Sequence, residues 1–356
     1  MNKAGHLLPL DGLRGALALW VVAYHSLTIS NCYAKLPRGS QVLADGGHAV
    51  TGFVILSGFV ITRLLFLRHE PYPIFIARRY LRLFPTFAFA IILALLVQHW
   101  GLMPSRLPPG EAWAYLLSHL TMLFCALPAS VPGSGSAILN PAWSISLEWQ
   151  FYLVAPLFAL VLGRGFGGLV IASAICVVAD RVVAPVLGSY GFGFGFLPSY
   201  LALFWLGMVT SWLSMTAHLT MMHLKIIAVL ALFGALLFLP YSPNIGTIVW
   251  LAFIACMVVL PKLTEALMGN PWVTYLGAIS YPVYLLHEPL MWLLLRPLRS
   301  VQEAWLLALL LFFGTCLVVL PLSALIHHLV ERPVIDWGKR VLARTGDSWR
   351  PQRVSG

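Results

Sequence analysis

The stretch "LDGLRGALALWVVAYH", residues 10–25, has the apolar content of a membrane-spanning helix, yet it contains Asp11, Arg14 and His25. A helix advances about 100° and 1.5 Å per residue, which places these three side chains on one narrow face. Asp11 and Arg14 are close enough in sequence to pair, and His25 lies about 16 Å beyond Arg14 along the axis. Ionisable groups in a span usually mark a functional site, although such groups can also serve only to hold helices together.

The composition of the whole chain supports a membrane protein. Of its 356 residues, 60% are hydrophobic and only 10% are charged, whereas a soluble domain has about 45–50% apolar and roughly 25% charged residues. The sequence therefore predicts an all-α, polytopic transmembrane bundle. The formal net charge is +10. We attribute it to cytoplasmic loops and tails, where Lys and Arg accumulate, rather than to nucleic-acid binding.

The apolar segments give a predicted topology, because a span needs roughly 20 apolar residues. Basic residues after the second segment and at the C-terminus predict that both termini are cytoplasmic, which requires an even number of crossings. Segment 112–128 is short and precedes a Gly/Ser/Pro-rich stretch, so we predict that it is re-entrant or partly inserted. About 10 crossings then remain. The eleven segments are 8–28, 48–67, 83–100, 112–128, 143–162, 168–187, 199–215, 225–240, 246–262, 272–295 and 303–330.

The predicted domain organisation is simple. We assign residues 1–335 to a single transmembrane domain and residues 336–356 to a basic cytoplasmic tail, because the loops between the apolar segments are too short to hold a separate folded domain.

Small residues are concentrated in the second segment, at Gly47, Gly52, Ser57 and Gly58. Small residues allow helices to pack closely in a membrane. They would also let a slender ligand lie between helices, with the Ser57 hydroxyl in contact with it. Both interpretations stay open.

The following basic stretch, "PYPIFIARRYLRLFP" (residues 71–85), resembles an interfacial helix and carries Arg78, Arg79 and Arg82. These arginines either set the topology and contact lipid headgroups or bind phosphate groups, because guanidinium forks match phosphate oxygens.

Two later stretches place polar groups inside apolar segments. In "NPAWSISLEWQFYLVAP" (residues 140–156), Ser144, Glu148 and Tyr152 share a helix face. Glu148 is either a structural carboxylate or a group that positions an acceptor hydroxyl. In "LGAISYPVYLLHEPLMW" (residues 276–292), Tyr284 and His287 favour a hydrogen-bonded contact between helices. The histidines show no H-x-x-x-H pattern, so no metal site is predicted.

Taken in order, these stretches resemble the membrane-bound acyltransferase-3 family, the bacterial integral-membrane O-acyltransferases of surface or exported sugars. The first stretch has the family's arginine and, after ten intervening residues, its histidine. The other matching stretches are "GFVILSGFVIT", "ARRYLRLFP", "WSISLEWQFYLVAP", "LGAISYPVYLLHEPL" and the closing "VERP". Two departures leave acceptor specificity open. Trp149 follows Glu148 where the family often has a second acid, and Glu288 follows His287 where it often has tryptophan.

The resemblance implies a donor and a base. The donor would be acetyl-CoA or another acyl-CoA, used as a co-substrate, with no bound cofactor. His25 would be the general base, accepting the proton of a sugar hydroxyl directly or through an acyl relay. Asp11 would hold Arg14, and Glu148 would assist at the acceptor side. The residues implied to bind the donor are Arg14, Ser57, Arg78, Arg79 and Arg82, and those implied to contact the substrate are Trp143, Ser144, Tyr152, Tyr284 and His287.

The same resemblance implies the partners and the location. The partners would be acyl-CoA, a glycan or lipid-linked saccharide acceptor and the lipid bilayer, without nucleic acid, and the protein would lie in the cell (inner) membrane. An alternative is a secondary transporter or permease in which Arg14, His25 and Glu148 form a substrate or proton pathway. The sequence shows no inverted repeat or paired broken helices, which argues against it. A third hypothesis is a signalling or scaffold protein whose polar residues only bridge helices.

Overall fold

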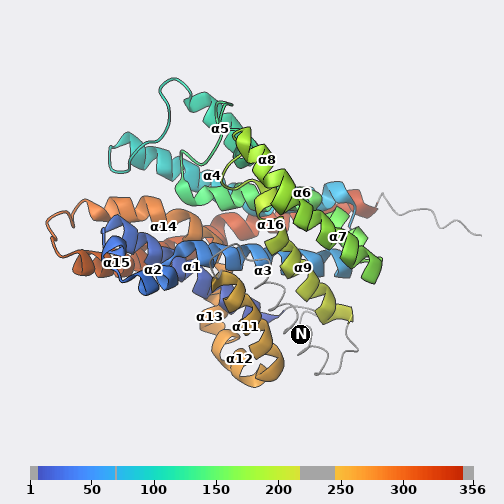
Figure 1. Cartoon of the computed structure of the whole chain (residues 1–356). Helices are drawn as coiled ribbons and strands as arrows, with labels where there is room; N and C mark the ends of the chain where they lie inside the picture. Colours follow the sequence, from blue (N-terminus) through green and yellow to red (C-terminus); the bar gives the residue numbers. More distant parts are fainter. Residues whose placement is uncertain (1–6, 69, 217–244, 348–356) are drawn as a thin grey trace, which may run out of the picture.

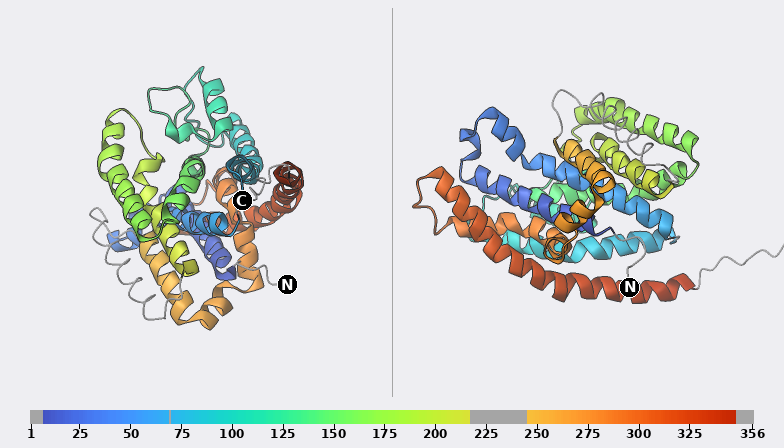
Figure 2. Two further views of the ribbon diagram at one scale, coloured as in Figure 1. Left: turned by 90° about the vertical axis from the view of Figure 1, so that its right-hand side faces the viewer. Right: turned by 90° about the horizontal axis from the view of Figure 1, so that it is seen from below.

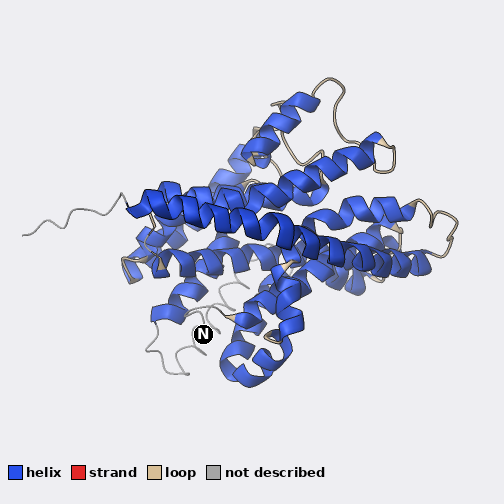
Figure 3. Ribbon diagram, turned by 180° about the vertical axis from the view of Figure 1, so that it is seen from behind, coloured by secondary structure: helices blue, strands red, loops and turns tan. Residues whose placement is uncertain are grey.

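The computed structural model describes residues 7–68, 70–216 and 245–347, and every regular element within these ranges is helical (Figures 1 and 3). Long helices lie side by side in one bundle, with α1 packed against α3, α14 and α15. The helices are α1 (Leu8–Ile29), α2 (Arg38–Ala44), α3 (Gly46–Leu67), α4 (Tyr72–His99), α5 (Ala112–Thr121), α6 (Trp143–Leu162), α7 (Phe166–Val178), α8 (Ala184–Ser189), α9 (Leu201–Thr216), α11 (Ile245–Val259), α12 (Pro261–Met268), α13 (Pro271–Ala278), α14 (Ser280–Leu295), α15 (Ala304–Ile326) and α16 (Arg332–Asp347).

Within the described residues, five helical segments are long and apolar enough to cross a membrane, or six if the sharply bent pair α11 and α12 forms one span. The five are Arg38–Leu67, Tyr72–His99, Asn140–Leu162, Phe166–Ser189 and Ala304–Leu342. The protein is thus an all-helical, multi-pass membrane protein. Helix α1, with its ionisable side chains, is not among the five. The count of about 10 crossings and the sides of the termini stay predictions, and the predicted segment 225–240 lies outside the described residues.

The predicted ends of an apolar segment agree well with the observed ends of a helix where the segment forms one straight helix. Helix α6 matches the predicted segment 143–162 at both ends. The predicted segment 272–295 is instead divided at Ile279 into α13 and α14. The basic stretch 71–85 does not form a separate interfacial helix, since it is the first half of the 28-residue helix α4. Helix α5 has 10 residues, about 15 Å, which is too short to cross a bilayer.

Two π-helical turns extend apolar helices without a break. Residues Ala179–Val183 join α7 to α8, and residues His327–Glu331 join α15 to α16. The second junction produces the long helix that runs along one side of the bundle (Figure 2). Because α16 packs on α4 and α15 packs on α14, this helix connects elements that are distant in the sequence.

Glycines set the closest approaches in the bundle. A Cβ on Gly58 of α3 would lie 2.1 Å from the Phe204 carbonyl oxygen of α9, and a Cβ on Gly207 of α9 would lie 1.9 Å from the Ile55 oxygen. A Cβ on Gly277 of α13 would meet the Asp11 oxygen of α1 at 1.9 Å. Backbones that touch in this way require glycine. The small-residue face of the second segment therefore serves helix packing at Gly58.

Candidate active site

A pocket between α1, α3, α4, α6, α9 and α14 collects many of the predicted site residues. It encloses about 680 Å³ of empty space, open solvent included. Its polar lining comprises Arg14, Ser57, Arg82, Ser144, Glu148, Ser280, Tyr281 and Tyr284, and apolar side chains such as Phe53 and Leu83 complete the wall. Six different helices contribute to it, so only the folded bundle assembles it.

Glu148 is the acceptor of a small hydrogen-bond network in this pocket. The Ser57 hydroxyl of α3 donates to Glu148 Oε1 over 2.9 Å, and the Tyr152 hydroxyl, one turn along α6, donates to the same oxygen. Glu148 and Tyr152 thus lie on one helix face, as predicted, and contact each other directly. Ser57 lines the pocket, while its neighbour Gly58 packs against α9. Contact of the Ser57 hydroxyl with a ligand stays a prediction.

Two guanidinium groups give the pocket a positive wall. Arg14 lies 3.9 Å from Asp11, the ion pair that the sequence predicts. Arg14 and Arg82 both line the pocket and are close enough for their charges to interact with each other and with Glu148. Each guanidinium also lies near a second carboxylate, Asp11 for Arg14 and Glu331 for Arg82, so their charges are balanced, while their N–H groups suit the oxygens of an anionic ligand.

The other two arginines of the basic stretch lie outside the pocket lining. Arg78 forms an ion pair with Glu70, and the Arg79 guanidinium lies 5.9 Å from the centre of the Phe75 ring. The Nε atoms of both arginines are buried and form no hydrogen bond. Of the three predicted phosphate-binding arginines, the structure thus brings only Arg82 into the pocket, and a donor role for Arg78 and Arg79 stays a prediction.

Two histidines form a pair at the far end of the polar face of α1. His287 Nε2 lies 3.0 Å from His25 Nδ1, and the His287 side chain is fully buried. His25 Nδ1 is also 3.1 Å from the Val21 carbonyl oxygen, and His287 Nδ1 is 3.3 Å from the Val283 oxygen. A carbonyl can only accept, so each Nδ1 carries a hydrogen. His287 Nε2 is then the acceptor for the His25 Nδ1–H, and the lone pair of neutral His25 is on Nε2.

Tyr284 connects the pocket to the histidine pair. Its hydroxyl accepts a hydrogen bond from Ser144 over 2.8 Å and donates to the Pro141 carbonyl over 3.1 Å. Its ring lies 6.1 Å from that of His287, one helical turn away. The result is a continuous series of polar side chains from Arg14 and the pocket to His25.

The predicted substrate residue Trp143 packs against aromatic side chains away from the pocket. Its ring contacts Phe194 and Tyr200, with centroid distances of 4.2 and 5.5 Å, and it does not line the pocket. Its assignment to the substrate stays a prediction.

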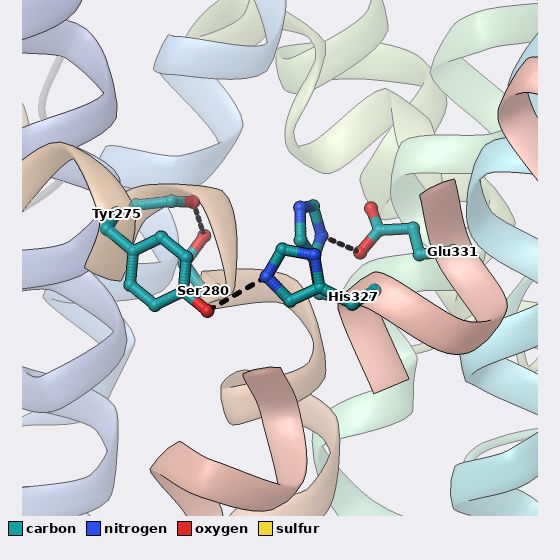
Figure 4. Close-up of polar contacts among 6 residues, drawn as sticks. Tyr275, Ser280, His327 and Glu331 are labelled. Carbon is teal, nitrogen blue, oxygen red and sulfur yellow. Dashed lines mark hydrogen bonds and ion pairs between the residues drawn. The ribbon is translucent and has the colours of Figure 1, made fainter. Parts of the chain in front are cut away.

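A second group of polar contacts lies at the π-helical turn between α15 and α16 (Figure 4). His327 Nδ1 lies 2.9 Å from Glu331, and the Tyr275 hydroxyl lies 3.2 Å from His328. Glu331 is only 3% exposed and lies close enough to Arg82 to stabilise its charge. Both histidines belong to a π-helical turn, a distortion that is frequent at functional sites. Sequence analysis missed Glu331; its place in the "VERP" stretch was the available signal.

Within the part of the chain that the structure describes, no group of three or more His, Cys, Asp or Glu side chains has the arrangement of a metal site.

The fold and the site together define a multi-pass helical membrane protein with a polar, arginine-lined pocket inside the bundle. The chain belongs to the acyltransferase-3 family, because the model of that family, described as an acyltransferase domain, matches residues 8–327.

Individual relatives support this assignment. A protein described as a membrane-bound transacylase, BcsY of Komagataeibacter xylinus, is 27% identical over 93% of this chain and 83% of its own length. A protein described as a peptidoglycan O-acetyltransferase, YrhL of Bacillus subtilis, is 25% identical over 94% of this chain, which spans only 56% of it. The acyltransferase MdmB of Streptomyces mycarofaciens is 30% identical over 42% of this chain and 38% of its own length. No solved structure matches the chain.

Proposed function

We propose that this protein is an integral-membrane O-acyltransferase that moves an acyl group, with acetyl the expected one, from acyl-CoA to a hydroxyl of a glycan or lipid-linked sugar. The observation that carries the proposal is the His25–His287 pair, which lies 3.0 Å apart at the end of a series of polar side chains that starts at Arg14. Membership of an acyltransferase family makes the transporter and scaffold hypotheses the less favoured ones.

The donor end of this series is the arginine-lined wall. Arg14 and Arg82 face the pocket, and guanidinium groups suit phosphate oxygens because they present paired donors. Arg78 and Arg79, on the same helix as Arg82, would extend this wall, and each has a buried Nε–H without a partner. The donor would be a cytoplasmic acyl-CoA that enters from this end, with its thioester directed along the pocket past Ser57.

The transfer step would use His25 as the general base. The Nε2 lone pair of neutral His25 would take the proton of the acceptor hydroxyl while that oxygen attacks the thioester carbonyl carbon. The new C–O bond forms and the C–S bond breaks, and CoA leaves as the thiol after receiving the proton from His25. General-base catalysis of this kind contributes about 10²–10⁴-fold to a rate. In the acyl-relay version of this scheme, the acyl group passes first to the enzyme and then to the acceptor hydroxyl.

His287 would act as a positioning residue. Because its Nε2 accepts the His25 Nδ1–H, it holds the one neutral tautomer of His25 whose lone pair is free to act as a base. Glu148 would hold Ser57 and Tyr152 in place near the reacting groups. Asp11, paired with Arg14, would fix that guanidinium at the donor end.

Relatives support the acceptor class that we propose. Two of them are described as peptidoglycan O-acetyltransferases, so a saccharide hydroxyl is the acceptor that we propose here. The cell (inner) membrane is the location that suits a donor on the cytoplasmic side and an acceptor on the outer side.

The experiment is an acyl-transfer assay with isotopically labelled acetyl-CoA, in membranes that contain wild-type protein or the His25→Ala variant. We expect label in the glycan fraction with wild type and a loss of at least about 100-fold with His25→Ala at equal protein level. His99→Ala is the matched control, because His99 is exposed at the end of α4 and does not line the pocket. Full transfer by His25→Ala would refute the mechanism.

A further inference from the structure

A second, smaller pocket lies beyond the first one along α14. It encloses about 280 Å³ of empty space, open solvent included. Its polar lining consists of Arg106, Ser136, Asn140, Glu288 and Trp292. These residues come from the segment after α4, the segment before α6, and α14.

The helical register of α14 connects the two pockets. Ser280 and Tyr284 line the first pocket, and Glu288 and Trp292 line the second. The four residues follow one another at intervals of four, so they form one face of the helix, and the pockets are about one turn apart. Tyr284 also donates to the carbonyl of Pro141, the residue after Asn140.

The second pocket contains a buried carboxylate oxygen that lacks a partner. Glu288 is 6% exposed, and its Oε2 atom forms no hydrogen bond. The Trp292 indole N–H and the Asn140 backbone N–H lie beside the carboxylate, and Arg106 is close enough to interact with its charge. A buried carboxylate oxygen without a hydrogen bond is costly, unless a ligand supplies the donor.

The chemistry of these groups suits a saccharide. A sugar hydroxyl is both donor and acceptor: it can donate to Glu288 and accept from the Trp292 indole N–H, the Arg106 guanidinium or the Asn140 side-chain amide. The opposite charges of Glu288 and Arg106 disfavour a strongly charged ligand. A single carboxylate does not make a cation site.

The position next to the histidine pair fits an acceptor. Glu288 directly follows His287, whose Nε2 contacts His25. A saccharide held in this pocket would therefore present hydroxyls at the level of the proposed base, one turn from the pocket proposed for the donor. We propose that this pocket is the acceptor subsite, with Glu288 and Trp292 binding hydroxyls of one sugar ring. This inference rests on the proposed function.

The test compares the full-length protein with the Glu288→Gln and Trp292→Phe variants in lipid nanodiscs. The donor is labelled acetyl-CoA, and the acceptors are the probe saccharides N-acetylglucosamine and chitobiose. We expect Glu288→Gln to raise the acceptor KM about 10-fold and Trp292→Phe about 3-fold, while the KM for acetyl-CoA changes less than 2-fold. Glu303→Gln removes an exposed carboxylate between α14 and α15 and is the matched control, with both constants unchanged.

An unchanged acceptor KM in folded Glu288→Gln and Trp292→Phe proteins would overturn the inference. The same conclusion would follow if the KM for acetyl-CoA rose instead. Should Glu288→Gln fail to fold, Trp292→Phe and Ser136→Ala give the answer.

Saturation-transfer NMR with N-acetylglucosamine, without donor, separates this inference from the proposed function. If wild type binds the saccharide and Glu288→Gln does not, the subsite is supported even when no acyl transfer occurs, and only the proposed reaction fails. Equal binding by the two proteins would contradict the subsite, whatever the transfer assay shows.

Discussion

At the scale of single residues, the geometry explains why the polar groups of α1 are tolerated in an apolar helix. Asp11 and Arg14 are paired, and His25 contacts His287. Each of these contacts supplies the hydrogen bond or opposite charge that hydrocarbon cannot. The same contacts orient these side chains, so they both offset the cost of burying the polar groups and hold the groups in place for the proposed reaction.

The contact of His287 with the His25 Nδ1–H leads to a prediction for His287. His287→Leu removes one of the two acceptors of the His25 Nδ1–H and leaves only the Val21 carbonyl, so kcat should fall about 10-fold, well within the roughly 10⁴-fold that a wrong tautomer costs a serine protease. His287→Gln should retain more activity, because its amide oxygen can accept the same hydrogen bond. The KM for acetyl-CoA should stay unchanged in both variants. Equal kcat in wild type and His287→Leu would exclude a positioning role.

At the scale of helices, direct backbone contact determines how the elements of the site are placed. Gly58 and Gly207 bring α3 against α9, and Gly277 brings α13 against α1 at Asp11. These contacts fix the rotation of α3 about its axis, and with it the direction of Ser57 toward Glu148. A change at Gly58 in the α3–α9 interface should therefore also move the adjacent Ser57 in the site.

Gly58→Ala should therefore disturb both stability and activity. The new methyl group would overlap the Phe204 carbonyl oxygen, and such overpacking costs about 1–3 kcal/mol. We expect a lower thermal unfolding midpoint in detergent and reduced acyl transfer. Gly167→Ala in α7 is the control, since a Cβ there meets nothing within 4 Å. If both variants unfold at the wild-type temperature, α3 and α9 do not approach as closely as described.

At the scale of the whole molecule, the long helix from α15 to α16 joins the predicted outer and inner ends of the bundle (Figure 2). Its π-helical turn places Glu331 beside Arg82 of α4. Its other end follows the loop after α14, the helix that carries His287 and Glu288. One continuous element thus spans the distance between the proposed donor and acceptor ends.

The predicted orientation of the molecule can be tested with reporter fusions. Because Arg332, Lys339 and Arg340 follow the last apolar segment, the C-terminus should be cytoplasmic. A C-terminal fluorescent protein should then fluoresce, and a C-terminal alkaline phosphatase should be inactive. Alkaline phosphatase fused after Arg299, in the loop before α15, should be active. The reverse pattern would invert the topology and with it the assignment of donor and acceptor ends.

The sequence by itself determined the class of the protein, most helix positions and the polar face of α1. These depend on composition and on a helical period that is local, so α6 agrees with its predicted segment and the Asp11–Arg14 pair is observed.

Only the tertiary structure decided which faces meet. The contact between His25 and His287, the inclusion of Arg82 but not Arg78 or Arg79 in the pocket, and the packing of Trp143 away from it depend on how helices rotate and cross. The crossings are set by glycine contacts between segments far apart in the chain, and no local pattern specifies which partner a glycine will touch.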